Sequence, residues 1–91
     1  MQHFDFLTVS DGGKSKVLKV ELYGGCDRMG DCRHNRLFFR IFDFPETIHV
    51  MYERSTDKVF EIVREKQIKF LDEANKFYAD VIKQFIDKHQ V

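Results

Sequence analysis

The last third of the chain shows the clearest separation of hydrophobic and polar positions. Residues 56–91 contain neither glycine nor proline, and on a helical projection their charged and apolar side chains fall on opposite faces. The charged face alternates in sign, and the pair Glu65–Lys69 has the i,i+4 spacing that stabilises a helix by about 0.3 kcal/mol. The pattern predicts one long amphipathic helix over residues 56–90.

The apolar face of this predicted helix is wider than one packing layer needs. From Phe70 to Ile86 it covers about half of the circumference, whereas a stripe of about 100° is enough to pack on a single layer. Its residues also follow the three- and four-residue spacing of paired helices, which fits both self-association and an intramolecular core. Because a domain of 91 residues has a limited core, we expect a homodimer. Its predicted interface is formed by Phe70, Phe77, Tyr78, Val81 and Phe85.

Residues 3–53 instead alternate with the two-residue period of β-strands. Strands are predicted at residues 3–10, 15–23, 36–44 and 47–53. Asp11-Gly12-Gly13 predicts a hairpin turn, and Phe44-Pro45-Glu46 predicts a tight turn with Pro45 in its second position. Short connections favour neighbouring antiparallel strands. The predicted fold is therefore α+β in a single domain, with a four-stranded antiparallel meander packed against one long C-terminal helix.

Strand 36–44 carries aromatic and basic residues on the side that faces away from the predicted helix. Because side chains alternate along a strand, Leu37, Phe39 and Ile41 are expected to face the helix. The opposite side carries Arg36, Phe38, Arg40, Phe42 and Phe44, next to Tyr23 of the preceding strand. Arginine and aromatic side chains are the anchors that dominate protein interfaces. We therefore expect this face to bind a larger protein.

Two other interpretations of the same face stay open. The Arg-x-Phe-x-Arg-x-Phe pattern is similar to the aromatic strand of RNA-recognition modules. This resemblance implies single-stranded nucleic acid, with bases stacked on Phe38 and Phe42 and phosphates near Arg36 and Arg40. The predicted order of strands and helix differs from that fold. Alternatively, the rings pack against one another beneath the arginine stems and no partner is involved.

The predicted loop at residues 24–35 contains both cysteines. Cys26, Cys32 and His34 form a C-x5-C-x-H pattern, which departs from the C-x2–4-C spacing of structural zinc sites and needs a fourth ligand from elsewhere. A disulfide between the two cysteines is the other alternative, but we expect two reduced thiols and no metal. Loops on a rigid scaffold commonly contact partners. We therefore count three further residues of this loop as candidate partner-binding residues: Arg28, Met29 and Arg33.

Charge and composition narrow the function classes. The chain has 15 basic and 15 acidic residues, a balance unlike that of proteins that bind nucleic acid through general attraction to phosphates. No run of 18 apolar residues and no signal-peptide pattern is present, so we expect a cytoplasmic protein without membrane contact. The four histidines are scattered, and no phosphate-binding glycine motif occurs. We expect neither enzymatic activity nor a cofactor.

Taken with the aromatic strand, these features predict a small protein that acts by stoichiometric protein–protein binding. The protein is expected to be an inhibitor or an adaptor of a larger protein, for example an inhibitor of the type with which phages block host enzymes. The alternative is a single-stranded nucleic-acid binder that uses the arginine and phenylalanine side chains of strand 36–44.

Overall fold

The structure is a computed structural model that describes residues 3–25, 35–64, 67–70 and 76–89. Within these ranges the chain forms six strands and then one helix. The elements are β1 (His3–Asp11), β2 (Lys14–Gly25), β3 (Arg36–Asp43), β4 (Glu46–Glu53), β5 (Lys58–Arg64), β6 (Gln67–Phe70) and α2 (Lys76–His89).

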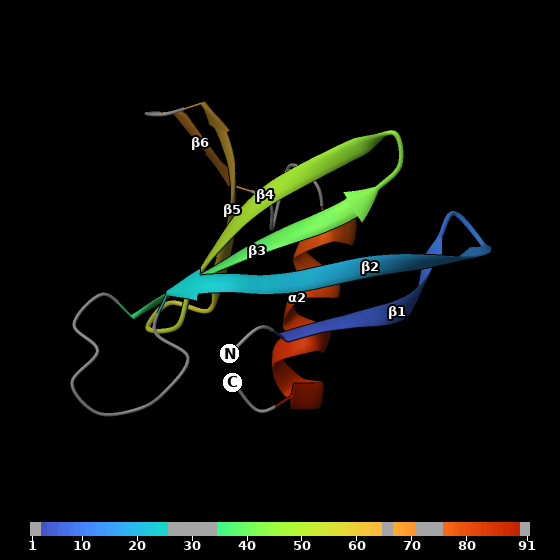
Figure 1. Cartoon of the computed structure of the whole chain (residues 1–91), viewed down its shortest axis with the longest axis horizontal. Helices are drawn as coiled ribbons and strands as arrows, with labels where there is room; N and C mark the ends of the chain where they lie inside the picture. Colours follow the sequence, from blue (N-terminus) through green and yellow to red (C-terminus); the bar gives the residue numbers. More distant parts are fainter. Residues whose placement is uncertain (1–2, 26–34, 65–66, 71–75, 90–91) are drawn as a thin grey trace.

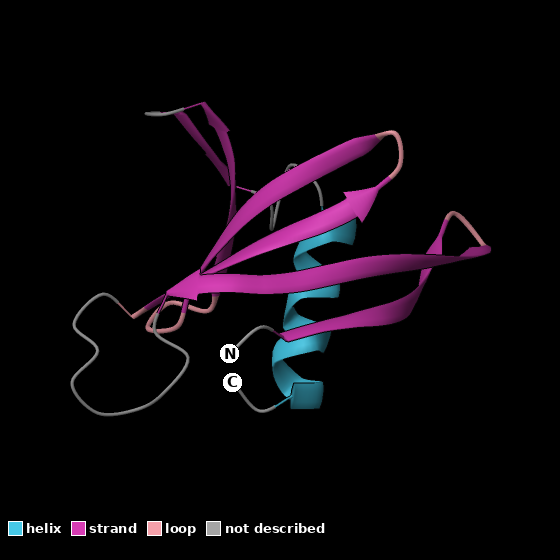
Figure 2. Ribbon diagram, in the orientation of Figure 1, coloured by secondary structure: helices cyan, strands magenta, loops and turns pink. Residues whose placement is uncertain are grey.

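The six strands form one antiparallel sheet in which the spatial order follows the chain, β1-β2-β3-β4-β5-β6. The predicted meander of the first four strands is confirmed, and the sheet continues through two further strands. Figures 1 and 2 show β1 to β4 running side by side, with α2 crossing them on one face. The α+β class is confirmed, although the number of strands and the length of the helix differ from the prediction.

The two predicted tight turns have different outcomes. Gly12 and Gly13 connect β1 to β2 with φ values of 59° and 85°, the two positive values of a type I′ hairpin turn that glycine adopts readily. Phe44 and Pro45 connect β3 to β4, so Pro45 occupies the third position of that turn, and the Phe44–Pro45 peptide bond is cis. The prediction that Pro45 occupies the second position is wrong.

The prediction of one helix over residues 56–90 is also wrong in its first half. Residues 58–64 and 67–70 are β5 and β6, and the helix begins only at Lys76. The segment Val59-Phe-Glu-Ile-Val is rich in β-branched and aromatic residues, which favour strands. Val59 pairs with Tyr52 across the β4–β5 ladder and is completely buried. Strand pairing therefore outweighs the weaker helical periodicity of this segment.

The core lies between the sheet and α2. Leu37, Phe39 and Ile41 of β3 are completely buried on the helix side, as predicted. The ring of Phe39 meets that of Phe85 from α2 edge to face, with 5.4 Å between their centroids. Each such buried side chain stabilises the fold by about 1.5–3 kcal/mol. The helix thus uses its apolar face to cover its own sheet.

This burial corrects the predicted dimer seam. Phe70 belongs to β6, so it is not on one helix with Phe77. Tyr78, Val81 and Phe85 are buried in the intramolecular core, and Phe77 packs partly against it. No continuous helical seam joins these five residues in the folded chain. The homodimer itself stays a prediction.

Polar side chains fix both ends of α2 to the sheet. Near its first turn, the Tyr78 hydroxyl donates a hydrogen bond of 2.7 Å to Asp43 at the end of β3. At its last turn, Lys88 lies 2.6 Å from the Asp5 carboxylate of β1. Burial and the hydrogen bond to Asp43 raise the pKa of Tyr78 above its usual range. Within the described residues, no helix is both long and apolar enough to span a membrane.

Candidate functional site

The sheet face opposite α2, which we call the outer face, gathers aromatic and charged side chains from neighbouring strands. Since the core residues occupy alternate positions, the residues between them point to the other side. The strand register places Phe6 beside Lys19 and Lys19 beside Phe42. One row further along the strands, it aligns Phe4, Glu21, Arg40 and His49. The outer face comprises Phe4, Phe6, Lys19, Glu21, Tyr23, Phe38, Arg40, Phe42 and His49.

Arg40 is held in the middle of the outer face by a carboxylate and a ring. Its guanidinium lies 2.5 Å from the Glu21 carboxylate and 3.9 Å from the centroid of the Tyr23 ring. Glu21 is only 7% exposed, so its charge needs a close partner, which Arg40 provides. The arginine is therefore preorganised by contacts within the protein.

Tyr23 follows Lys19 and Glu21 on the outer face by the alternation of β2, and it lies at a bulge of this strand. The pairing with β3 shifts between Leu22 and Gly24, which leaves Tyr23 as the extra residue. Its ring lies 6.4 Å from that of Phe38 and 6.5 Å from that of His49. The Gly24-Gly25 pair was the signal of an irregular strand end in the sequence.

Lys19 connects the rings of two strands that do not pair with each other. Its ammonium nitrogen lies 5.0 Å from the centroid of the Phe4 ring and 5.3 Å from that of Phe42. Both distances suit cation–π attraction. The rings of Phe4 and Phe6 contact each other edge to face and are 53% and 58% exposed. The edge of the outer face at β1 is therefore the most exposed aromatic part of it.

The structure brings together four of the nine predicted partner-binding residues. Phe38, Arg40 and Phe42 lie on the outer face with Tyr23, although the two phenylalanines are partly buried. Arg36 lies at the start of β3, with its guanidinium 3.8 Å from the Glu53 carboxylate. Phe44 is 95% exposed in the turn that follows β3.

Phe4 and Phe6 were not among the predicted site residues. The signal was the alternation of residues 3–10, because Leu7 and Val9 take the buried positions and leave the phenylalanines on the other side. Reading that strand beside its hairpin partner places both rings next to Lys19 and Glu21. The prediction instead considered mainly the aromatic strand 36–44.

The predicted loop site lies outside the described residues. This applies to the candidate metal ligands Cys26, Cys32 and His34 and to the candidate partner-binding residues Arg28, Met29 and Arg33. Among the residues that the structure describes, no three His, Cys, Asp or Glu side chains are grouped in a way that could hold a metal ion. The hypotheses about this loop stay predictions.

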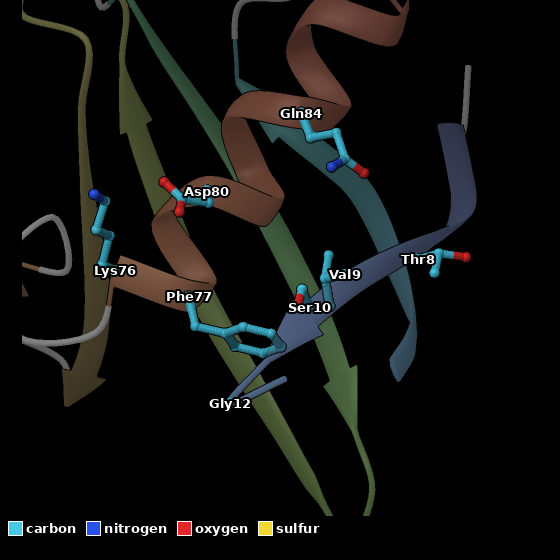
Figure 3. A pocket seen from close by; sticks show the side chains of 8 residues that line it. All are labelled: Thr8, Val9, Ser10, Gly12, Lys76, Phe77, Asp80 and Gln84. Carbon is cyan, nitrogen blue, oxygen red and sulfur yellow. The ribbon is translucent and has the colours of Figure 1, made fainter. Parts of the chain in front are cut away.

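A second surface feature is an open groove of about 600 Å³ between β1 and α2 (Figure 3). It lies on the helix side of the sheet, and is therefore separate from the outer face. The residues that line it are Thr8, Val9, Ser10, Gly12, Lys76, Phe77, Asp80 and Gln84.

The groups of the outer face are suited to recognising the surface of another molecule. They offer exposed rings, an arginine fixed by its carboxylate and one ammonium group between two rings. No protein-family model, curated protein or solved structure matches the chain.

Proposed function

We propose that the protein acts by stoichiometric binding to a larger protein, and that the outer face is the interface. The observation that carries this proposal is the exposure of three rings on one face of the sheet: Phe4 at 53%, Phe6 at 58% and Tyr23 at 40%. Exposed aromatic side chains on one face mark interaction surfaces, because a partner that covers them removes apolar area from water.

The charges of the outer face favour a protein partner over single-stranded nucleic acid. Arg40 is paired with Glu21, and Arg36 lies near Glu53, so each arginine already has a carboxylate close to it. Phosphate binding would have to compete with these carboxylates, and it normally requires several available cations. The ammonium of Lys19 lies over rings instead. A partner with apolar side chains and one carboxylate opposite Lys19 suits this face best.

The contacts within the outer face also reduce the cost of binding. Tyr23 is packed between Arg40, Phe38 and His49, and aromatic and arginine anchors of this type dominate interface energies. Side chains that are already ordered lose less conformational entropy when a partner arrives. A small inhibitor, of the type with which phages block host enzymes, or an adaptor is the expected form of this activity.

Site-specific photocrosslinking tests the proposal in the native host cells. We expect Phe6→p-benzoylphenylalanine to yield a covalent adduct with one larger protein. The same photoreactive residue at Val63, which is 49% exposed on β5, is the control and should not yield that adduct. The identified protein is then purified and titrated, and a 1:1 complex is expected. A fall in the partner's own activity at that stoichiometry distinguishes an inhibitor from an adaptor.

Variants of the rings then establish the interface. The double variant Phe4→Ala/Phe6→Ala should weaken the purified complex by about ten- to a hundredfold, whereas Val63→Ala should bind like the wild type. Unchanged affinity of a folded double variant would contradict the proposal. An adduct between two copies of the chain, with a mass by light scattering of twice 10.9 kDa, would assign the outer face to the predicted homodimer instead.

A further inference from the structure

We infer that the free edge of β1 is a second binding site, which accepts an extended peptide segment of a partner protein as an added strand. This site is formed by the backbone of residues 8–10 and by the groove between β1 and α2. It lies apart from the outer face and does not depend on the proposed function of that face.

β1 lacks most of the features that protect the edge of a sheet. In the described part of the chain it is an edge strand, nine residues long, and its pairing with β2 has no register shift. It contains no lysine, proline or glycine. The opposite edge differs, because β6 has only four residues and its pairing with β5 contains a register shift. Long, regular edge strands without such features are templates for another strand.

The hairpin turn determines which backbone groups of β1 point outward. In a two-residue type I′ hairpin, the residues that flank the turn form a hydrogen-bonded pair, which here is Asp11 with Lys14. Hydrogen-bonded and non-bonded pairs alternate along an antiparallel ladder. The odd-numbered residues of β1 therefore bond to β2, and the even-numbered residues direct their N–H and C=O groups to the free edge.

Asp5 blocks the first half of this edge for an added strand. Its carboxylate accepts a hydrogen bond of 2.7 Å from the outward N–H of Phe6, and it also contacts Lys88 and His89 at the end of α2. Thr8 and Ser10 follow in the second half, where both residues line the groove. The outward backbone groups of Thr8 and Ser10 therefore lie beside the groove between β1 and α2.

The groove provides space for side chains of an added strand. Figure 3 shows Phe77 extending from α2 toward Ser10 and Gly12, and Val9 pointing from β1 toward the helix. Val9 and Phe77 form an apolar floor, and Asp80 contributes a carboxylate to the rim. Every second side chain of a strand added to β1 would point to the helix side, where the groove lies.

An extended peptide is the occupant that these groups select. The alternating donors and acceptors of Thr8 and Ser10 match those of another extended backbone. A second copy of β1 fits less well, because Asp5 closes half of the strand in both copies and leaves only a short overlap. We expect an aliphatic side chain over Val9 and Phe77, with a lysine or arginine two positions away that faces Asp80.

Peptide selection combined with amide hydrogen exchange tests this site. A displayed library of random 12-residue peptides is selected against the full chain, and the tightest peptide is synthesised and titrated. Bound peptide should slow exchange of the Thr8 and Ser10 amides, which have no partner in the β1–β2 ladder. Selected sequences should share an aliphatic residue and a basic residue spaced i,i+2.

Thr8→Pro removes one outward N–H, and proline is tolerated on edge strands where its missing N–H faces solvent. We expect it to weaken peptide binding about tenfold or more, whereas Thr8→Val keeps the N–H and should stay within about twofold. Asp80→Lys, at an exposed position of α2, should weaken binding about fivefold without any change in the strand. If Thr8→Pro does not fold, the affinity of Asp80→Lys for the peptide tests the inference.

Several results would overturn the inference. They are the failure of the library to yield a binder, peptide binding without slower exchange at Thr8 and Ser10, and peptide binding that Phe4→Ala/Phe6→Ala abolishes. Exchange at these amides that slows with protein concentration alone would identify a second copy as the occupant. Retained peptide binding in the double ring variant separates this site from the outer face, whichever way the photocrosslinking experiment ends.

Discussion

Among single residues, Asp5 has the widest structural role. Its carboxylate lies 2.6 Å from the Lys88 ammonium and 3.0 Å from Nε2 of His89, and these contacts hold its pKa at about 2. Basic residues in the last turn also interact favourably with the helix dipole. The same carboxylate accepts the outward N–H of Phe6. One side chain therefore docks the end of α2 onto β1 and closes half of the sheet edge.

The lowered pKa of Asp5 predicts a specific loss of stability in acid. The carboxyl has a pKa of about 2 in the folded chain against 3.8 for an ordinary aspartate, so the unfolded state takes up a proton first as the pH falls. The stabilisation is complete above about pH 4 and is lost between about pH 4 and pH 2. We expect the urea midpoint of the wild type to fall more steeply over this range than that of Asp5→Asn.

Urea titrations at pH 6, 4 and 3 provide the measurement for this prediction. Asp43, whose pKa is lowered by Lys16, should leave some acid sensitivity in the variant. Equal slopes for the wild type and Asp5→Asn would show that the Asp5 contacts contribute no net stability.

At the scale of elements, the strand β5 and the helix α2 show how similar patterns lead to different structures. In α2, Tyr78, Val81, Ile82 and Phe85 are buried at the three- and four-residue spacing of one helical face. In β5, Val59 faces the core and Phe60 faces away from it beside Met51, which is the alternation of a strand. The two segments share a charged, glycine-free composition, but only β5 has the open edge of β4 beside it.

Two identical substitutions in β5 test its assignment as a strand. Val59→Thr keeps the shape of the side chain but places a hydroxyl at a position with no exposure, and should cost about 1–3 kcal/mol of unfolding free energy. Val63→Thr makes the same change at 49% exposure and should cost less than about 0.5 kcal/mol. Urea denaturation of both variants gives the comparison, and equal costs would contradict the described orientation of β5.

At the scale of the whole molecule, the two faces of the sheet have different surroundings. The inner face is covered by α2 and contains the core. The outer face has no layer over it within the described residues, yet it carries Phe4, Phe6 and Tyr23. The chain has no net charge, with 15 basic and 15 acidic residues. A molecule with no net charge and one aromatic face lacks the excess of basic side chains that general attraction to nucleic acid requires.

The charge balance leads to a prediction about nucleic acid. We expect a fluorescently labelled 12-nucleotide single strand to show no saturable binding in 150 mM salt, because the arginines of β3 lie beside Glu21 and Glu53. Fluorescence anisotropy at 50 and 200 mM salt measures this. Saturable binding that weakens at least tenfold between these salt concentrations, and that Phe38→Ala/Phe42→Ala abolishes in the folded protein, would favour the nucleic-acid alternative instead.

The sequence alone was enough to predict the local features whose cause is local. The first four strands, the Gly12-Gly13 hairpin and the inward direction of Leu37, Phe39 and Ile41 follow from β-forming residues, turn chemistry and the alternation of side chains. The α+β class and the grouping of Phe38, Arg40 and Phe42 on one face follow from the same rules.

Only the tertiary structure decided the features that depend on a partner strand. Residues 58–64 and 67–70 form strands because the edge of β4 offers backbone hydrogen bonds that a helical pattern does not reveal. The apolar face of α2 is buried against its own sheet. The bulge at Tyr23 and the closure of half of the β1 edge by Asp5 likewise depend on residues far along the chain. Local sequence sets which conformations are available, and contacts between distant segments select among them.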